Sequence, residues 1–88
     1  MPMRNNDQYV QSRAEPFAWR GAYDASSNLE YEGWAEPGAS ESGSSWLICK
    51  YTYDASNNLT HTKWAQTTPY PPASYNQVWS NYLALTYV

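Results

Sequence analysis

The sequence has few of the side chains on which catalysis and covalent stabilisation depend. It contains one cysteine and one histidine in 88 residues, so it can form no internal disulfide and no cluster of Cys and His ligands. Five Lys and Arg against eight Asp and Glu give a net charge of −3, which argues against a nucleic-acid-binding face. No apolar run has the length of a membrane span, or of a signal peptide within residues 1–10. We therefore expect synthesis in a cytoplasm, with no nucleic-acid partner, no membrane partner and no cofactor.

Aromatic side chains, in contrast, are abundant. Nine Tyr, five Trp and one Phe make up 17% of the chain. Tyr and Trp combine a large contact area with one polar group, which suits both small cores and interfaces. A chain of this size buries roughly 60–65% of its unfolded surface, so its core is thin. This leaves little room for a core, a deep pocket and a catalytic apparatus together.

One phrase occurs twice, thirty residues apart: "YDASSNLEYEGWAE" at 23–36 and "YDASNNLTHTKWAQ" at 53–66, identical at eight of fourteen positions. Asp, Ser and Asn in "DASSN" and "DASNN" favour turns closed by side-chain-to-backbone hydrogen bonds. Both turns lead into segments with the period of two that is typical of strands. Two copies are too few for a solenoid, so we interpret the repeat as one hairpin pattern used twice.

The alternation after the first turn predicts a half-buried strand with Leu29, Tyr31, Gly33 and Ala35 on one face and Glu30, Glu32, Trp34 and Glu36 on the other. "SSWLICKYTY" (44–53) is apolar on both faces, which predicts the central strand, with Trp46 and Ile48 on one side. Residues 46–53 and 58–65 are expected to form a hairpin closed by 54–57. Cys49 lies in the apolar run "WLICKY" and is expected to be a buried, inert thiol.

The two ends of the chain differ from this pattern. Residues 1–22 are polar and without a period, which predicts an N-terminal arm, flexible or docked on a partner, before a single domain at 23–88. Phe17 and Trp19 would point to one side of an extended chain, either as an anchor or as part of a short edge strand. A short helix is expected at 74–81 with Ser74 as N-cap, and a last strand at 82–88. The fold class is mainly β, a small antiparallel sheet of about four strands with one short helix.

Candidate chemistry is scarce, and we expect a protein that is not an enzyme. His61 sits inside a predicted strand and is expected to be solvated. The Asp-x-Ser-x-Asn spacing of each turn resembles the opening of a calcium loop, but Leu replaces its glycine and Ala its final Glu, so a plain turn and no metal are predicted. Glu30 and Glu32 are expected to be solvated glutamates on an outer face.

The repeated Trp-Ala ending is the informative feature. Strict alternation places Trp34 and Trp64 on the more polar face of their strands. Either the strand twists so that both indoles enter a second small core beneath the arm or helix, or they lie at a surface that meets another chain or a sugar. The candidate assembly or binding residues are Phe17, Trp19, Trp34, Trp64 and Trp79.

Two resemblances follow from these motifs. "YTYDASNNLT" is similar to the hairpin unit of YD/Rhs-repeat shell proteins, with Asn57 in place of the usual glycine. More broadly, residues 23–88 resemble a group of small proteins encoded among the virion genes of tailed bacteriophages. The matching positions are Tyr31, Gly33, Ala35, Gly38, Trp46, Ile48, Lys50, Trp64, Ala65, Val78, Trp79, Leu85 and Tyr87. The departures are Tyr82, where Arg is usual, and "QTTPYPPASY" at 66–75, where a Gly-Asp/Asn loop is usual.

The second resemblance implies a virion structural protein, a decoration, neck or tail component that assembles with other virion proteins in many copies or as a homo-oligomer. An acidic domain rich in Tyr and Trp, with a polar arm, agrees with an assembly subunit. The alternative is a carbohydrate-binding module for host recognition, with exposed Trp34 and Trp64 stacked on sugar rings. An inhibitor or host-takeover factor is a third class, to which no particular residue points.

Overall fold

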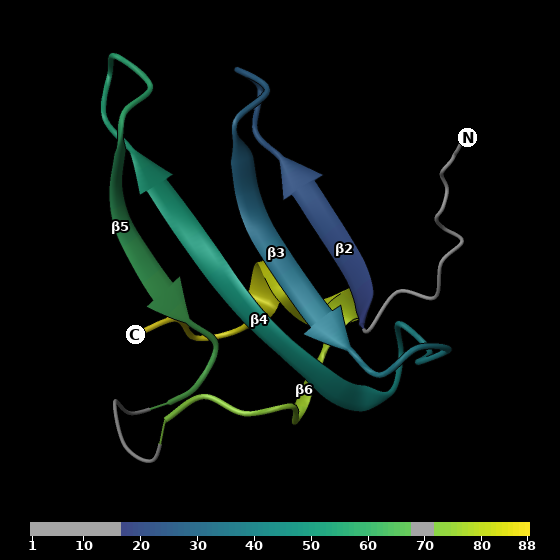
Figure 1. The fold of residues 1–88 in the computed structure, drawn as a ribbon. Helices are drawn as coiled ribbons and strands as arrows, with labels where there is room; N and C mark the ends of the chain where they lie inside the picture. The colour runs from purple at the N-terminus through teal and green to yellow at the C-terminus, as the bar shows by residue number, and fades with distance from the viewer. Residues whose placement is uncertain (1–16, 68–71) are drawn as a thin grey trace, which may run out of the picture.

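The computed structural model describes residues 17–67 and 72–88, which build one antiparallel sheet with a short helix behind it (Figure 1). The main strands follow in chain order: β2 (Ala18–Tyr23), β3 (Leu29–Ala35), β4 (Ser44–Tyr53) and β5 (Leu59–Trp64). A short strand, β6 (Gln77–Val78), pairs with the start of β4 and leads directly into the 3-10 helix η1 (Trp79–Ala84). The predicted fold class is confirmed. Among the described residues, no helix is long and apolar enough to cross a membrane.

The two repeated phrases form two hairpin turns of the same design. Asp24 Oδ1 accepts the backbone N–H groups of Ser26 at 2.8 Å and Asn28 at 2.9 Å. Asp54 repeats both bonds in the second turn, each at 2.9 Å. The carboxylates therefore serve to close the turns, as the plain-turn interpretation predicted.

Each turn ends on a residue in the left-handed region, Ser27 and Asn57, both with φ 66°. A type I turn followed by such a residue is a common way to join antiparallel strands. The two turns also contact each other, since Asn28 Nδ2 donates to Asn57 Oδ1 at 2.9 Å. The repeat thus places the two hairpin turns next to each other at one end of the sheet.

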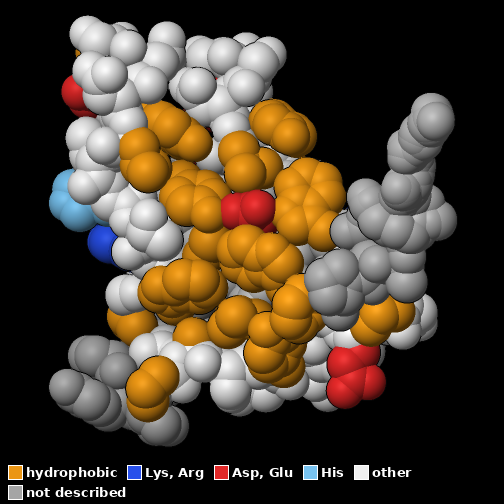
Figure 2. Space-filling model, viewed as in Figure 1, with side chains coloured by type: hydrophobic (Ala, Val, Ile, Leu, Met, Phe, Trp, Pro, Cys, Tyr) orange, Lys and Arg blue, Asp and Glu red, His pale blue; other side chains and the backbone are white. Residues whose placement is uncertain are grey.

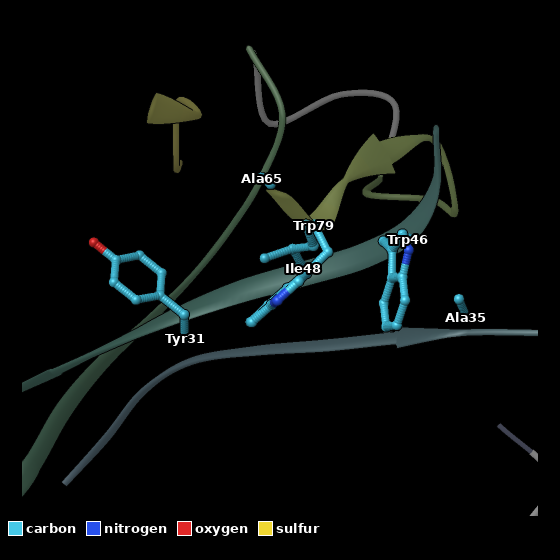
Figure 3. Packing of buried hydrophobic residues seen from close by; sticks show 6 residues of the cluster. All are labelled: Tyr31, Ala35, Trp46, Ile48, Ala65 and Trp79. Carbon is cyan, nitrogen blue, oxygen red and sulfur yellow. The ribbon is translucent and has the colours of Figure 1, made fainter. Parts of the chain in front are cut away.

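The core lies on the face of the sheet that η1 covers. Buried side chains from β3, β4, the helix and the residue that follows β5 meet there (Figure 3): Tyr31, Ala35, Trp46, Ile48, Ala65 and Trp79. Gly33 lets the Trp79 indole approach the sheet, because a Cβ at Gly33 would stand 2.8 Å from Trp79 Cε3. Trp46 and Ile48 are fully buried on the one face of β4 that the alternation predicted.

The C-terminal segment differs from its prediction. The helix begins at Trp79 instead of residue 74, is a 3-10 helix, and has no side-chain cap. Trp79 and Tyr82, three residues apart, stack with ring centroids 4.8 Å apart, which suits the 3-10 geometry, where side chains at i and i+3 are aligned. Because these rings both turn toward the core, the expected strand at 82–88 is reduced to a single bridge between Ala65 and Tyr87, flanked by backbone bonds to β5 and Gln66.

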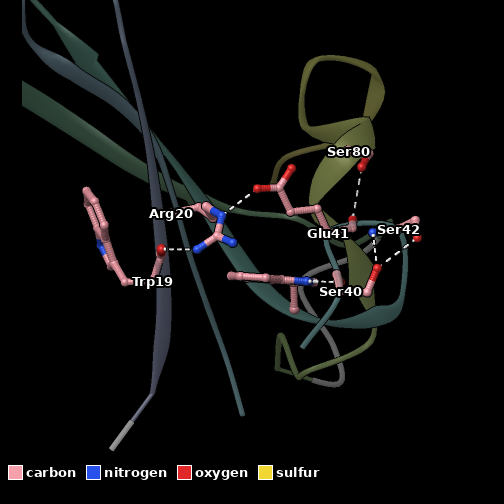
Figure 4. Close-up of polar contacts among 7 residues, drawn as sticks. Trp19, Arg20, Ser40, Glu41, Ser42 and Ser80 are labelled. Atoms are coloured by element: carbon pink, nitrogen blue, oxygen red, sulfur yellow. Dashed lines mark hydrogen bonds and ion pairs between the residues drawn. The ribbon is translucent and has the colours of Figure 1, made fainter. Parts of the chain in front are cut away.

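The N-terminal boundary also differs. The edge strand β2 (Ala18–Tyr23) takes in the last residues of the predicted arm (1–22) and pairs with β3, which agrees with the alternative of a short edge strand at this end of the chain. The polar residue Arg20 is compatible with a strand here because its side chain has partners elsewhere in the fold. Its guanidinium lies 5.6 Å from the Trp46 ring centroid and pairs with Glu41, as Figure 4 shows. The rest of the expected arm, residues 1–16, lies outside the described ranges.

Candidate functional site

The face of the sheet turned away from η1 is rich in aromatic side chains, and no helix or strand of residues 17–67 and 72–88 covers it. Cross-strand partners in a sheet point to the same side, and the register pairs Trp19 with Trp34, Trp34 with Leu47, and Cys49 with Trp64. Figure 2 views this side and shows hydrophobic side chains gathered across the strands around one acidic group. We call this surface the aromatic face. It comprises Trp19, Leu29, Glu32, Trp34, Leu47, Tyr51 and Trp64.

Trp34 and Trp64 lie side by side on the aromatic face, with ring centroids 6.2 Å apart and planes tilted by 32°. Both are half-buried, while Cys49 between their strands is fully buried. Strict alternation therefore holds through the Trp-Ala endings, and neither indole enters a core beneath the helix. Whether residues 1–16 contact them falls outside the described part of the chain.

Leu29 joins this face through an irregularity in the sheet. The register shifts between Ala22 and Tyr23, so one extra residue of β3 is accommodated there. Leu29 Cδ1 consequently stands 3.0 Å from the place of a Cβ on Gly21, on the same side as the Trp19 indole. The predicted grouping of Leu29 with Tyr31 and the other core residues is wrong for this reason.

Glu32 provides the acidic group of the aromatic face. Trp19 Nε1 donates to Glu32 Oε2 at 2.8 Å, and the Tyr51 hydroxyl donates to Oε1. Burial raises the pKa of Tyr51, and its hydrogen bonds with Cys49 and Glu32 raise it further, so this hydroxyl keeps its proton and remains a donor. Glu32 is thus a half-buried, hydrogen-bonded carboxylate and differs from the solvated glutamate that the sequence predicted.

Cys49 lies beneath this face as a buried thiol. Its exposed fraction is 0%, and desolvation is the main cause that raises its pKa. Both properties keep the sulfur protonated and out of reach of reagents. The prediction of a buried thiol is confirmed.

The basic side chains of the described chain lie on the other side of the sheet. Arg20 pairs in register with Gly33, whose surroundings are the core rings of Trp79 and Trp46. Lys50 Nζ lies 5.6 Å from the centroid of the Tyr31 ring, which is also in the core. Lys63 is the cross-strand partner of Lys50 and so shares its face. Within residues 17–67 and 72–88, the aromatic face carries a carboxylate but none of these cations.

A shallow hollow of about 400 Å³ adjoins the aromatic face. Its lining residues are Leu47, Trp64, Gln66, Pro72, Ala73 and Val88. Gln66 Oε1 is buried and accepts no hydrogen bond from the described residues. Leu47 and Trp64 belong to both surfaces, so the hollow continues the aromatic face beyond the end of β5.

The remaining candidate residues lie elsewhere. Trp79 is 6% exposed and belongs to the core, so its expected place at a binding surface is wrong. Phe17 is exposed and stacks on Tyr75, with ring centroids 6.3 Å apart. His61 is exposed on β5, as predicted, with Nδ1 3.1 Å from Thr60 Oγ1. In the described ranges, no group of three or more acidic, His or Cys side chains is arranged to hold a metal.

Sequence reasoning missed the roles of Glu32 and Tyr51. The contact between Trp19 and Glu32 depends on the pairing of β2 with β3. This pairing was not predicted, because Trp19 was assigned to an arm.

No family model, curated protein or solved structure matches this chain. The resemblance to small phage virion proteins therefore stays a prediction from the motif residues in the sequence. Of these, Tyr31, Gly33, Ala35, Trp46, Ile48, Ala65 and Trp79 are buried. The motif consequently describes how this fold builds its core, with Trp64 as the member that reaches the aromatic face.

Proposed function

We propose that the protein is a non-enzymatic virion structural protein, a decoration, neck or tail component, that assembles with other virion proteins through its aromatic face. The observation that carries this proposal is the one-sided construction of the sheet. One face is closed by η1, and the other presents Trp19, Trp34 and Trp64 to the outside.

The composition of the aromatic face suits docking between proteins. Tyr and Trp dominate the energetically important residues of protein interfaces, where their rings pack and their polar atoms find partners. The face is broad and shallow, whereas small-molecule sites are usually concave clefts that enclose most of the ligand. Trp19 remains 44% exposed, which leaves apolar area for a partner to bury.

The test is quantitative mass spectrometry of gradient-purified particles from the virus whose genome encodes the chain. The proposal predicts a fixed ratio to the major capsid protein, and the value of that ratio separates a capsid-wide decoration from a neck or tail component. Absence from the particles would contradict the proposal.

Carbohydrate binding is the second candidate, favoured by the pairing of two tilted indoles with a carboxylate on the same face. Indole faces stack on sugar rings, and Glu32 could accept sugar hydroxyls. This function predicts that Trp34→Ala abolishes glycan binding on an array while particle assembly continues. The assembly proposal predicts instead that the wild-type protein binds no glycan on the array.

A further inference from the structure

We propose that the partner of the aromatic face is a protein segment that places an arginine side chain against Glu32 and an apolar side chain in the hollow beside Trp64. The inference rests on the proposed docking function and names the chemistry of the docked surface. It follows from the charge on the face, the free acceptor positions of Glu32, and the position of the hollow.

The charge distribution of the sheet is the first argument. Glu32 is held among aromatic rings by two neutral donors, Trp19 Nε1 and the Tyr51 hydroxyl, which orient the carboxylate but leave its charge in place. The basic residues of the described chain, Arg20, Lys50 and Lys63, lie on the opposite face. Covering the aromatic face with a purely apolar partner would therefore desolvate an unpaired carboxylate, which is costly.

The geometry of Glu32 favours arginine as the partner group. Each carboxylate oxygen has two acceptor positions, and one of them is used by a donor among the described residues. The remaining positions can accept a planar guanidinium, which also stacks on indole faces such as those of Trp19 and Trp34. A lysine ammonium would satisfy the charge but would lack both the paired hydrogen bonds and the stacking.

The hollow supplies the second contact. Trp64 and Leu47 connect it to the aromatic face, and its other lining residues are largely apolar. β5 lies two strands from β3, so Glu32 and Trp64 are separated by roughly 10 Å across the sheet. An extended partner segment would cover this separation with about two to four residues between its arginine and its apolar side chain.

A second copy of the chain suits the aromatic face less well. In a two-fold symmetric pairing the same patch meets itself, so a central Glu32 would face its counterpart. Like charges brought together in a buried interface oppose association. The acidic face is instead complementary to a cationic partner.

The experiment uses the full-length protein labelled with ¹⁵N and two probe peptides, acetyl-Leu-Thr-Thr-Thr-Arg-Thr-Thr-Thr-Leu-amide and the same peptide with citrulline in place of arginine. Citrulline has a similar shape and no charge. The indole N–H signals are followed by NMR up to about 5 mM peptide, the range of weak affinities expected for a short segment. We expect shifts at Trp19, Trp34 and Trp64, with about tenfold tighter binding of the arginine peptide.

Two variants assign this difference to one carboxylate. Glu32→Gln should remove the preference for arginine. Glu36→Gln, which removes the same charge from an exposed position at the end of β3, should keep it. Equal binding of both peptides at the aromatic face would overturn the inference and leave the docking function standing. No binding of the arginine peptide, or a preference that survives Glu32→Gln, would also overturn it.

Two further outcomes would assign the face to another occupant and overturn the proposal. Shifts of the Trp19 and Trp34 signals in the Arg4→Gln/Arg13→Gln variant, without peptide, would identify residues 1–16 of the chain itself as the occupant. Concentration-dependent shifts of the same signals, together with dimers in sedimentation velocity, would identify a second copy. The proposed function is tested separately by the particle measurement, so its failure can be distinguished from failure of the arginine contact.

Discussion

Ser27 and Asn57 occupy equivalent turn positions with φ 66°, a conformation that costs most L-residues about 1–2 kcal/mol. Glycine adopts it without this cost, and Asn tolerates it better than Ser. We expect Ser27→Gly to increase the free energy of unfolding by about 0.5–1 kcal/mol in urea denaturation. Asn57→Gly should give a smaller increase.

The matched control is Ser26→Gly, one position earlier in the same turn and without a positive φ. There glycine only adds freedom to the unfolded chain, so stability should fall by a few tenths of a kcal/mol. A loss of stability in Ser27→Gly would contradict this account of the turn.

Gly33 has a different role, which is to leave room for Trp79. A Cβ at this position would lie 2.8 Å from Trp79 Cε3 and 3.3 Å from Trp46 Cε3. We expect Gly33→Ala to lower the free energy of unfolding by about 1–3 kcal/mol, because both core rings must shift. In Gly43→Ala the nearest atom stands 3.5 Å away, so a change within about 0.5 kcal/mol is expected. Similar losses in the two variants would contradict the packing argument.

At the scale of elements, the second hairpin turn carries a pH dependence. The backbone N–H of Asn58 holds the pKa of the Asp54 carboxyl below its ordinary value of 3.8, against a smaller opposing effect of desolvation. A pKa lowered in the folded state stabilises the protein above the unfolded value, and this contribution is lost as the pH falls through the folded value. Asp54→Asn keeps an acceptor in the turn but does not titrate.

We therefore expect wild-type protein to lose more stability than Asp54→Asn between about pH 5 and pH 2, measured as the free energy of unfolding in urea. Above pH 5 the difference in free energy of unfolding between the two proteins should stay constant. Equal losses across the acid range would contradict the role of Asp54.

The elements that the sequence predicted well are those in which local turn chemistry and alternation agree. β4, β5 and their turn follow directly from an apolar strand and "DASN". The C-terminal helix was misplaced because Trp79 and Tyr82, three residues apart, stack on one side of a 3-10 turn, a spacing that the alternation of 82–88 does not indicate. β2 was predicted only as an alternative to an arm, because its polar residue Arg20 is accommodated by contacts with Trp46 and Glu41, which only the fold brings near.

The candidate site was predicted in part for a similar reason. Alternation alone placed Trp34 and Trp64 on the outer face of their strands. It could not place Trp19 beside Glu32, because that contact depends on pairing between strands, nor move Leu29 outward, because the register shift arises in the assembled sheet.

At the scale of the whole molecule, one face of the sheet builds the core, and the other is the face that we propose as the docking surface. Trp79 packs in the core, and Trp79→Ala should cost about 3–5 kcal/mol, enough to unfold much of the protein. Trp34 is half-buried on the aromatic face, so Trp34→Ser should lower the free energy of unfolding by less than Trp79→Ala does. The variant should keep the circular dichroism spectrum of the folded wild type. A loss as large as that of Trp79→Ala would place Trp34 in a structural role.

The most direct test of the account is the incorporation of Trp34→Ser into virus particles, measured by mass spectrometry as copies per major capsid protein. The control is Leu83→Ser, which removes a side chain that is 74% exposed on η1. The account predicts that the wild type and Leu83→Ser are incorporated at the same fixed ratio, while folded Trp34→Ser is largely absent. Incorporation of Trp34→Ser at the wild-type ratio would contradict the assignment of the aromatic face as the docking surface.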